Sequence, residues 1–238
     1  MAPNFDVDLA GKTALVTGAG AGSGRAIALA LAANDASVSV IDLNIERADH
    51  VAELIGARGG SALPLRADVS NRFQVANAIE RARDAFGKID ILVNASSIFH
   101  AEPMLNIDEW NWRRQIEINI TGAFFCLQLV GRVMADEGGG MIINLAAVEA
   151  YESSLPAGIG YVTGGAGLIG MTRQAARELA PHGIRVNCIA AKTQDETSAE
   201  IVDAALFLSS NHAESVTGQV VGIDAGRSWR AQLCDRAQ

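Results

Sequence analysis

The sequence is poor in cysteine, proline and charge, and these shortages narrow the class of protein. Its 238 residues include three cysteines, five prolines and only 19% charged residues, against 49% hydrophobic residues. With this composition the chain can bury a substantial core, and we expect one domain over residues 1–238. An odd number of cysteines, with Cys126 and Cys188 in apolar segments, indicates reduced core thiols rather than the disulfides of a secreted domain.

The sequence also lacks the marks of a nucleic-acid-binding, secreted, membrane or metal-binding protein. Nineteen basic residues against 27 acidic ones give a net charge of −8, with no basic cluster, so nucleic acid and anionic membranes are not expected partners. Residues 1–12 contain no apolar segment, and we expect no later run long enough to span a bilayer, which predicts a cytoplasmic location. The four histidines show no metal-ligand spacing. The expected partner is a small molecule.

The most informative stretch runs from Thr13 to Ile27, where a short apolar run leads into a glycine-rich turn and then a helical pattern. Glycines at such a junction let the backbone turn tightly and approach a pyrophosphate, which sits on the free amides at the start of the helix. An ordinary strand-to-helix turn is the alternative. The candidate cofactor-binding residues here are Gly18, Gly22, Ser23 and Gly24.

The next apolar run ends in Asp42, 18 positions beyond Gly24. A carboxylate at the tip of the second strand accepts from both adenosine ribose hydroxyls and repels a 2′-phosphate. Leu43 follows, with no basic residue beside it, so we expect NAD rather than NADP. The spacing Thr-Gly-x-x-x-Gly-x-Gly, together with this acid, resembles the short-chain dehydrogenase/reductase family.

The resemblance extends from residue 9 to residue 226 and implies a single α/β domain. This domain is expected to be a doubly wound parallel sheet, the Rossmann fold, with helices on both faces. It also implies that Asp68 and Val69 contact the adenine ring, although Asp68 could instead cap the helix that begins after it. Asn94 and Ala95 follow the fourth expected strand and are assigned to the cofactor groove, where the family has Asn-Asn-Ala-Gly; Ala95 and the two serines after it depart from that pattern.

The catalytic residues that the resemblance implies are incomplete. Tyr161 stands at the position of the family's tyrosine, and Asn119 at that of a buried asparagine that helps to hold a water near the catalytic lysine. The serine that orients the substrate oxygen is replaced by Ala147, and the lysine by Gly165. The flanking sequence follows the family closely, so the register is well fixed.

These losses affect one site. In the family, the tyrosine exchanges a proton with the substrate oxygen, while the lysine lowers the pKa of the tyrosine and holds the nicotinamide ribose. Without that cation, Tyr161 is expected to keep a pKa near 10, which leaves roughly one molecule in a thousand as phenolate at neutral pH. Alcohol oxidation needs this base and suffers most. Glu149, Tyr151 or Lys192 could replace the missing groups. The segment near 193–199, which in the family covers the substrate, is largely missing, so the sequence does not indicate which substrate is bound.

Two functions therefore stay open. One is an NAD(H)-dependent oxidoreductase that acts on a carbonyl or alcohol with weakened machinery. The other is a catalytically silent NAD(H)-binding protein, either a sensor or the inactive partner in a hetero-oligomer. We also expect a homo-oligomer, dimer or tetramer, built on the helices 108–134 and 161–179. The second helix contains four glycines, Gly164, Gly165, Gly167 and Gly170. One explanation is close packing against the same helix of a neighbouring subunit, and the alternative is relaxed selection at a silent site, in which case restoring the family's residues should do no structural harm.

Overall fold

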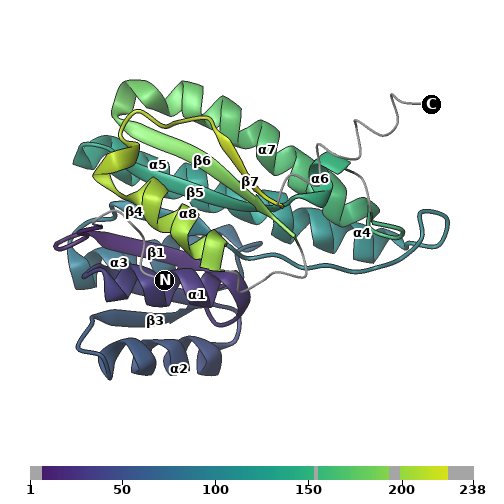
Figure 1. Cartoon of the computed structure of the whole chain (residues 1–238). Coiled ribbons are helices and arrows are strands. Elements are labelled where there is room, and N and C mark those ends of the chain that lie inside the picture. Colours follow the sequence, from purple (N-terminus) through teal and green to yellow (C-terminus); the bar gives the residue numbers. More distant parts are fainter. Residues whose placement is uncertain (1–6, 153–154, 193–198, 225–238) are drawn as a thin grey trace.

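The sheet has seven strands, all parallel, in the order β3-β2-β1-β4-β5-β6-β7 (Figure 1). The computed structural model describes residues 7–152, 155–192 and 199–224. The strands are β1 Thr13–Thr17, β2 Ser37–Asp42, β3 Ala62–Arg66, β4 Ile91–Asn94, β5 Gly140–Ala147, β6 Ile184–Ala191 and β7 Val220–Ile223. The order reverses between β1 and β4, and ligands bind outside the carboxyl ends of the strands at such a point. This confirms the predicted Rossmann architecture.

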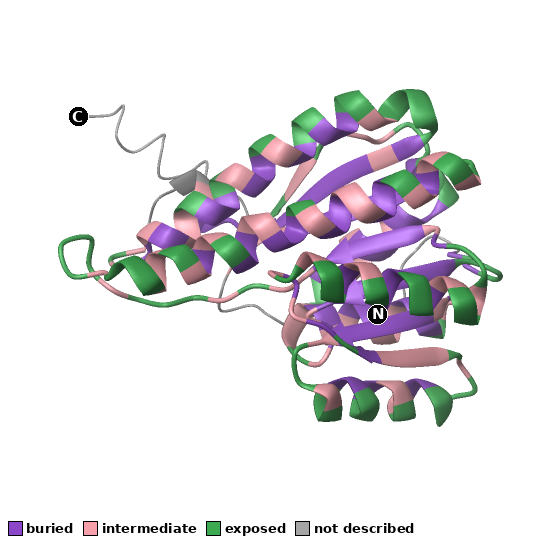
Figure 2. Cartoon of the chain, turned by 180° about the vertical axis from the view of Figure 1, so that it is seen from behind, coloured by how far each residue is buried: buried purple, intermediate pink, exposed green. Residues whose placement is uncertain are grey.

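Helices cover both faces of the sheet (Figures 1 and 2). One hydrophobic cluster joins the sheet to α1, α2 and α8, and a second joins it to α3, α5 and α7. Because both faces are covered, β1 and β4 are buried along their whole length, which explains why they are largely apolar in the sequence. The helices are α1 Gly22–Ala33, α2 Ile45–Gly56, α3 Arg72–Phe86, α4 Glu109–Ile116, α5 Ala123–Glu137, α6 Glu149–Glu152, α7 Ile159–Leu179 and α8 Ala199–Ser209, with short 3-10 turns η2 Ala180–His182 and η3 Asn211–Ala213.

The helix predicted over residues 108–134 is interrupted. Asp108 is its N-cap, and between α4 and α5 the chain forms the π-helical segment η1, Glu117–Gly122. The whole helix Glu109–Glu137 is long and apolar enough to cross a membrane by length and composition, so the expectation that no run reaches that length was wrong. Half of its apolar window is buried, and Val130 and Met134 belong to the core under the sheet. We therefore assign this helix to the protein core.

The glycines of α7 pack against the same chain. A Cβ at Gly164 would lie 2.9 Å from Asn119 Cβ, closer than real Cβ contacts allow. Gly160 meets Gln115 and Gly167 meets Ile120 in the same close way, whereas Gly170 has nothing within 4 Å. This corrects the expected explanation: the glycines at 160, 164 and 167 let α7 approach α4 and η1 within one chain, and no neighbouring subunit is needed to account for them.

Two of the three cysteines are described, and both are free and buried. Burial raises the pKa of the Cys126 thiol and of the Cys188 thiol to about 12. Both therefore stay protonated at neutral pH and behave as small apolar side chains, as expected. Cys234 and the segment 193–198, in which the missing lid was expected, lie outside the described residues.

Candidate functional site

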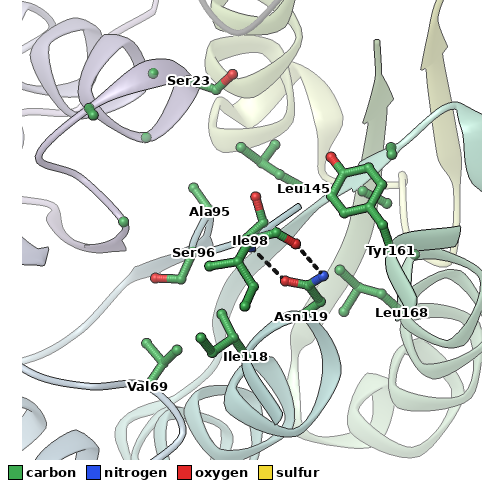
Figure 3. Close-up of a pocket in the computed structure, with 18 of the residues that line it drawn as sticks. Ser23, Val69, Ala95, Ser96, Ile98, Ile118, Asn119, Leu145, Tyr161 and Leu168 are labelled. Carbon is green, nitrogen blue, oxygen red and sulfur yellow. Dashed lines mark hydrogen bonds between the residues drawn. The ribbon is translucent and has the colours of Figure 1, made fainter. Parts of the chain in front are cut away.

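A pocket of about 330 Å³ follows the carboxyl ends of the central strands (Figure 3). Its walls come from the ends of β2, β1, β4, β5 and β6 and from α1, η1 and α7. It brings together almost all the residues that the sequence marked, although these lie up to 143 positions apart in the chain. Those lining the pocket are Gly18, Gly22, Ser23, Gly24, Asp42, Leu43, Asp68, Val69, Ala95, Asn119 and Tyr161.

The glycine turn forms a backbone cradle at the start of α1. Gly18 and Gly22 have positive φ angles of 63° and 54°, which glycine adopts without strain. A Cβ at Gly18 would lie 2.8 Å from Ser96 Cα, and one at Gly24 would collide with the Gly18 carbonyl oxygen. α1 has no side-chain cap among the described residues, so its first amides are available to an anion. The cradle therefore fits a pyrophosphate.

The carboxylate of Asp42 is fixed at the tip of β2. Its Oδ2 accepts from Gly20 N at 2.9 Å and its Oδ1 from Asn44 N at 2.9 Å. A Cβ at Gly20 would lie 2.7 Å from Asp42 Oδ2, so only glycine allows this approach. Arg47 of α2 also lines this end of the pocket. It was not predicted as a site residue, because it lies five positions beyond Asp42, inside the next helix.

Asp68 is held by Ser70 and Arg114 instead of capping a helix. Its Oδ1 accepts from Ser70 Oγ at 2.6 Å, and its Oδ2 pairs with Arg114 Nη2 at 3.1 Å. Burial alone would raise the pKa of Asp68, but hydrogen bonds from Ser70 and Arg114 outweigh it and lower the pKa below its usual value. The N-cap of α3 is Asn71, so the capping alternative for Asp68 was wrong. Arg114 also lines the pocket and was not recognised from the sequence.

Asn94 lies behind the pocket and does not line it, contrary to its assignment to the groove. Its Nδ2 donates to Asn144 Oδ1 at 2.9 Å, and Asn144 Nδ2 donates to Thr172 Oγ1 at 2.9 Å. All three side chains are buried. This series of hydrogen bonds joins β4 to β5 and β5 to α7, so Asn94 helps to set the position of the helix that carries Tyr161.

Tyr161 enters the pocket from the first turns of α7, beside Leu145 and Leu168 (Figure 3). Its ring packs against that of Phe99, with centroids 5.1 Å apart and an interplanar angle of 59°. Ala147 and Gly165 line the same end of the pocket. Tyr161 therefore lines this end of the pocket together with two positions that carry no polar side chain.

The space beside Gly165 is already partly filled. A Cβ at this position would lie 3.0 Å from Ala150 Cβ in α6 and 3.8 Å from Ala147 N. A contact of 3.0 Å is tighter than nine in ten real Cβ contacts, so α6 would have to move by a few tenths of an ångström to admit a side chain. Restoring a lysine at position 165 therefore has a structural cost.

Asn119 uses its side chain to hold the segment after β4. Ile98 N donates to Asn119 Oδ1 at 2.8 Å, and Asn119 Nδ2 donates to Ile98 O at 2.9 Å (Figure 3). The residue is only 7% exposed and lies on the π-helical segment η1, a deviation that is frequent at functional sites. Its amide therefore positions the pocket wall beside Tyr161.

Of the candidate substitutes for the missing groups, Lys192 lines the pocket. Glu149 is 7% exposed and lies outside the pocket lining. The side chain of Tyr151 lies outside the described residues. Among the described residues no group of three His, Cys, Asp or Glu side chains could hold a metal ion.

The fold and the pocket together define a Rossmann-type dinucleotide-binding protein with a tyrosine in its pocket. The family model for short chain dehydrogenases matches residues 12–201. The chain therefore belongs to the short-chain dehydrogenase/reductase family of oxidoreductases, whose cofactor is a nicotinamide dinucleotide.

Characterised relatives align over nearly the whole chain. A D-threitol dehydrogenase from Mycolicibacterium smegmatis is 33% identical, with 95% of this chain and 96% of that protein covered. A 3-oxoacyl-(acyl-carrier-protein) reductase from Thermotoga maritima is 31% identical, with 92% and 98% covered. The crystal structure of a short-chain type dehydrogenase/reductase from Mycobacterium marinum has a TM-score of 0.88 at 33% identity, with 92% and 96% covered.

Proposed function

We propose that this protein binds NAD(H) and carries out hydride transfer between the nicotinamide and a carbonyl or alcohol in a weakened form that favours carbonyl reduction. The observation that carries this proposal is that Tyr161, the glycine cradle and Asp42 all line one pocket. The names of the relatives, which include both dehydrogenases and a reductase, support the reaction class.

The residues of the chain have separate roles in this proposal. The first amides of α1 hold the pyrophosphate, and Asp42 accepts from the adenosine ribose. The bound dinucleotide supplies the hydride. Tyr161, as a neutral phenol, donates its proton to the carbonyl oxygen of the substrate. Because Ala147 offers no second donor to that oxygen, the rate falls by about 10²- to 10³-fold relative to a complete site, by analogy with the loss of one oxyanion-hole donor.

The preference for NAD over NADP rests on Asp42. Its fixed carboxylate repels a 2′-phosphate, while Arg47 nearby would attract one. We expect the repulsion by Asp42 to outweigh the attraction by Arg47, because two backbone hydrogen bonds hold the Asp42 carboxylate in place. Calorimetric titration should show tighter binding of NADH than of NADPH, and Asp42→Asn should narrow the difference. Equal or tighter binding of NADPH to the unaltered protein would contradict the preference.

A catalytically silent NAD(H)-binding protein, acting as a sensor or as the inactive subunit of a hetero-oligomer, is the second candidate. The observation that favours it is the packing of α6 against Gly165, where the family has its lysine. A turnover assay with NADH and a panel of ketones separates the two candidates. Consumption of NADH that is lost in Tyr161→Phe supports the enzyme, whereas NADH binding without consumption by either protein supports the silent binder.

We further propose that the protein is a homo-oligomer that pairs its helices α4, α5 and α7. Phe124 on α5 is 40% exposed and Trp110 on α4 is 70% exposed, which leaves apolar surface on this side of the chain. Sedimentation should give a dimer or tetramer, and a monomer at micromolar concentration would contradict the proposal. The cytoplasmic location stays a prediction from the sequence.

A further inference from the structure

Lys192 is a cation in the pocket to which the family pattern gives no role. The chain has only three lysines. Lys12 and Lys88 both pair with Asp90, at 3.5 Å and 2.7 Å, away from the pocket. Lys192, directly after β6, lines the pocket and forms no ion pair with any residue that the structure describes. Its ammonium group is therefore available to a ligand.

The strand register places Lys192 next to the incomplete part of the site. Ala191 is the partner of Ala147 in the β5–β6 ladder, and Val148 N donates to Ala191 O at 2.9 Å. Neighbouring strands lie about 4.8 Å apart. Lys192 follows Ala191, so its backbone lies one residue beyond the position that pairs with Ala147 on the neighbouring strand. Gly165 of α7 is close to the same alanine, because a Cβ added at Gly165 would lie 3.8 Å from Ala147 N.

The walls at this end of the pocket are mostly apolar. An ammonium group that faces apolar walls loses hydration, so it gains from an acceptor that a ligand brings. Lysine carries three donors on a flexible four-carbon stem, which allows it to reach an acceptor from a neighbouring strand. The apolar residues that line this end are Leu145, Ala147, Leu168, Ile189, Ala191 and Ile201.

We propose that Lys192 binds the nicotinamide half of NAD(H) and supplies from β6 the positive charge that position 165 lacks on α7. The acceptors are the hydroxyls of the nicotinamide ribose or the pyrophosphate oxygens beside them, which share the chemistry that an ammonium group recognises. This inference rests on the proposed function, because it requires that NAD(H) occupies the pocket.

The test compares two variants and two ligands by calorimetry. Lys192→Met keeps an unbranched apolar stem without the charge, and Lys192→Arg keeps the charge. Loss of a charge-assisted hydrogen bond should weaken NADH binding to Lys192→Met by about tenfold or more, and Lys192→Arg should recover part of it. AMP, which carries only the adenosine end, should bind all three proteins equally, and this shows that the variants are folded.

Two results would overturn the inference while leaving the proposed function intact. One is equal NADH affinity in the unaltered protein and in Lys192→Met, and the other is an equal loss for NADH and AMP. If the unaltered protein binds AMP but not NADH, the proposed function fails as well.

A second measurement needs no folded methionine variant. Reductive methylation with ¹³C-formaldehyde labels only three lysines and the amino terminus, and the Lys192 signal is the one missing from the spectrum of Lys192→Arg. NADH should shift this signal and AMP should not. A signal that NADH leaves unmoved would overturn the inference, even if Lys192→Met proved too unstable to titrate.

Discussion

The two ends of the pocket are built in opposite ways. At the Asp42 end, the carboxylate and the glycine cradle are fixed by backbone hydrogen bonds and by contacts that only glycine permits. At the Tyr161 end, the pocket is lined by Ala147 and Gly165, where the sequence resemblance predicts a serine and a lysine, and the walls are mostly apolar. The first end lies on β1, α1 and β2, and the second on β5 and α7. Because the two ends lie on different elements, a substitution at one end can leave the geometry of the other end unchanged.

The largest effect is expected at the cradle. Gly24→Ala places a methyl group against the Gly18 carbonyl and displaces the first amides of α1, so NADH binding should fall by at least about a hundredfold. Gly56→Ala, at the end of α2 with nothing within 4 Å, is the matched control and should bind NADH normally. Calorimetry measures both. Unchanged NADH affinity in Gly24→Ala would show that the cofactor does not use this cradle.

The second largest effect is expected when the serine and the lysine of the family are restored at the Tyr161 end. Ala147→Ser with Gly165→Lys should tighten NADH binding and raise ketone reduction by about 10²-fold, because Tyr161 is already in place. Adding Ala150→Gly should raise it further, since it relieves the 3.0 Å contact with the new Cβ.

The control variant carries Gly165→Met in place of Gly165→Lys. Methionine is also a long unbranched side chain but has no charge. Initial rates of NADH oxidation are compared at saturating NADH. If the methionine version matches the lysine version, the charge is not what the site lacks.

Two glycine substitutions in α7 test whether this helix packs against η1 of the same chain. Gly164→Ala should cost about 1 to 3 kcal/mol in free energy of unfolding, because its Cβ would lie 2.9 Å from Asn119 Cβ. Gly170→Ala, in the same helix with open space, should gain up to about 1 kcal/mol. Urea unfolding at several protein concentrations measures both. A neutral Gly164→Ala would contradict the packing of α7 on η1.

The smallest effect is expected at the ion pair between Asp68 and Arg114. The pKa of Asp68 is lowered in the folded protein, so its contribution to stability is present above the unfolded carboxyl pKa of about 3.9 and is lost as the pH falls through the lowered folded value. Arg114→Met should therefore cost less than about 1 kcal/mol near neutral pH, since both side chains are partly exposed, and nothing in strong acid.

The matched control is Arg113→Met on the same helix, where the arginine pairs with exposed Glu109. Free energies of unfolding by urea at a series of pH values give the comparison. A deficit in Arg114→Met that stays constant down to strong acid would mean that Arg114 acts through packing and not through Asp68.

The sequence predicted the residues whose roles depend on local order in the chain. The glycine turn and Asp42 each follow a strand whose apolar run is clear, so their places at the carboxyl edge of the sheet could be derived. Tyr161 was identified only through the resemblance to the family. Arg114 could not be derived from local order, because its role depends on how α4 packs beside Asp68, 46 positions earlier in the chain.

The partner of the α7 glycines could not be predicted for the same reason. A run of glycines indicates close packing, but the local sequence does not say against which helix, and the structure supplies α4 and η1 of the same chain. For Asn94, the sequence predicted the position of the residue but not the direction of its side chain. Its position at the end of a parallel strand was correct, but the buried Asn144 beside it takes its side chain away from the pocket.

The rate at which the unaltered protein consumes bound NADH tests the central claim most directly. Enzymes commonly turn over at about 10 s⁻¹, and the loss of one donor to the substrate oxygen costs about 10²- to 10³-fold. The account predicts that NADH binds and is consumed at below about 0.1 s⁻¹ with every ketone in a broad panel. Reduction of any ketone at about 10 s⁻¹ by the unaltered protein would contradict it, because the Tyr161 end would then be chemically complete.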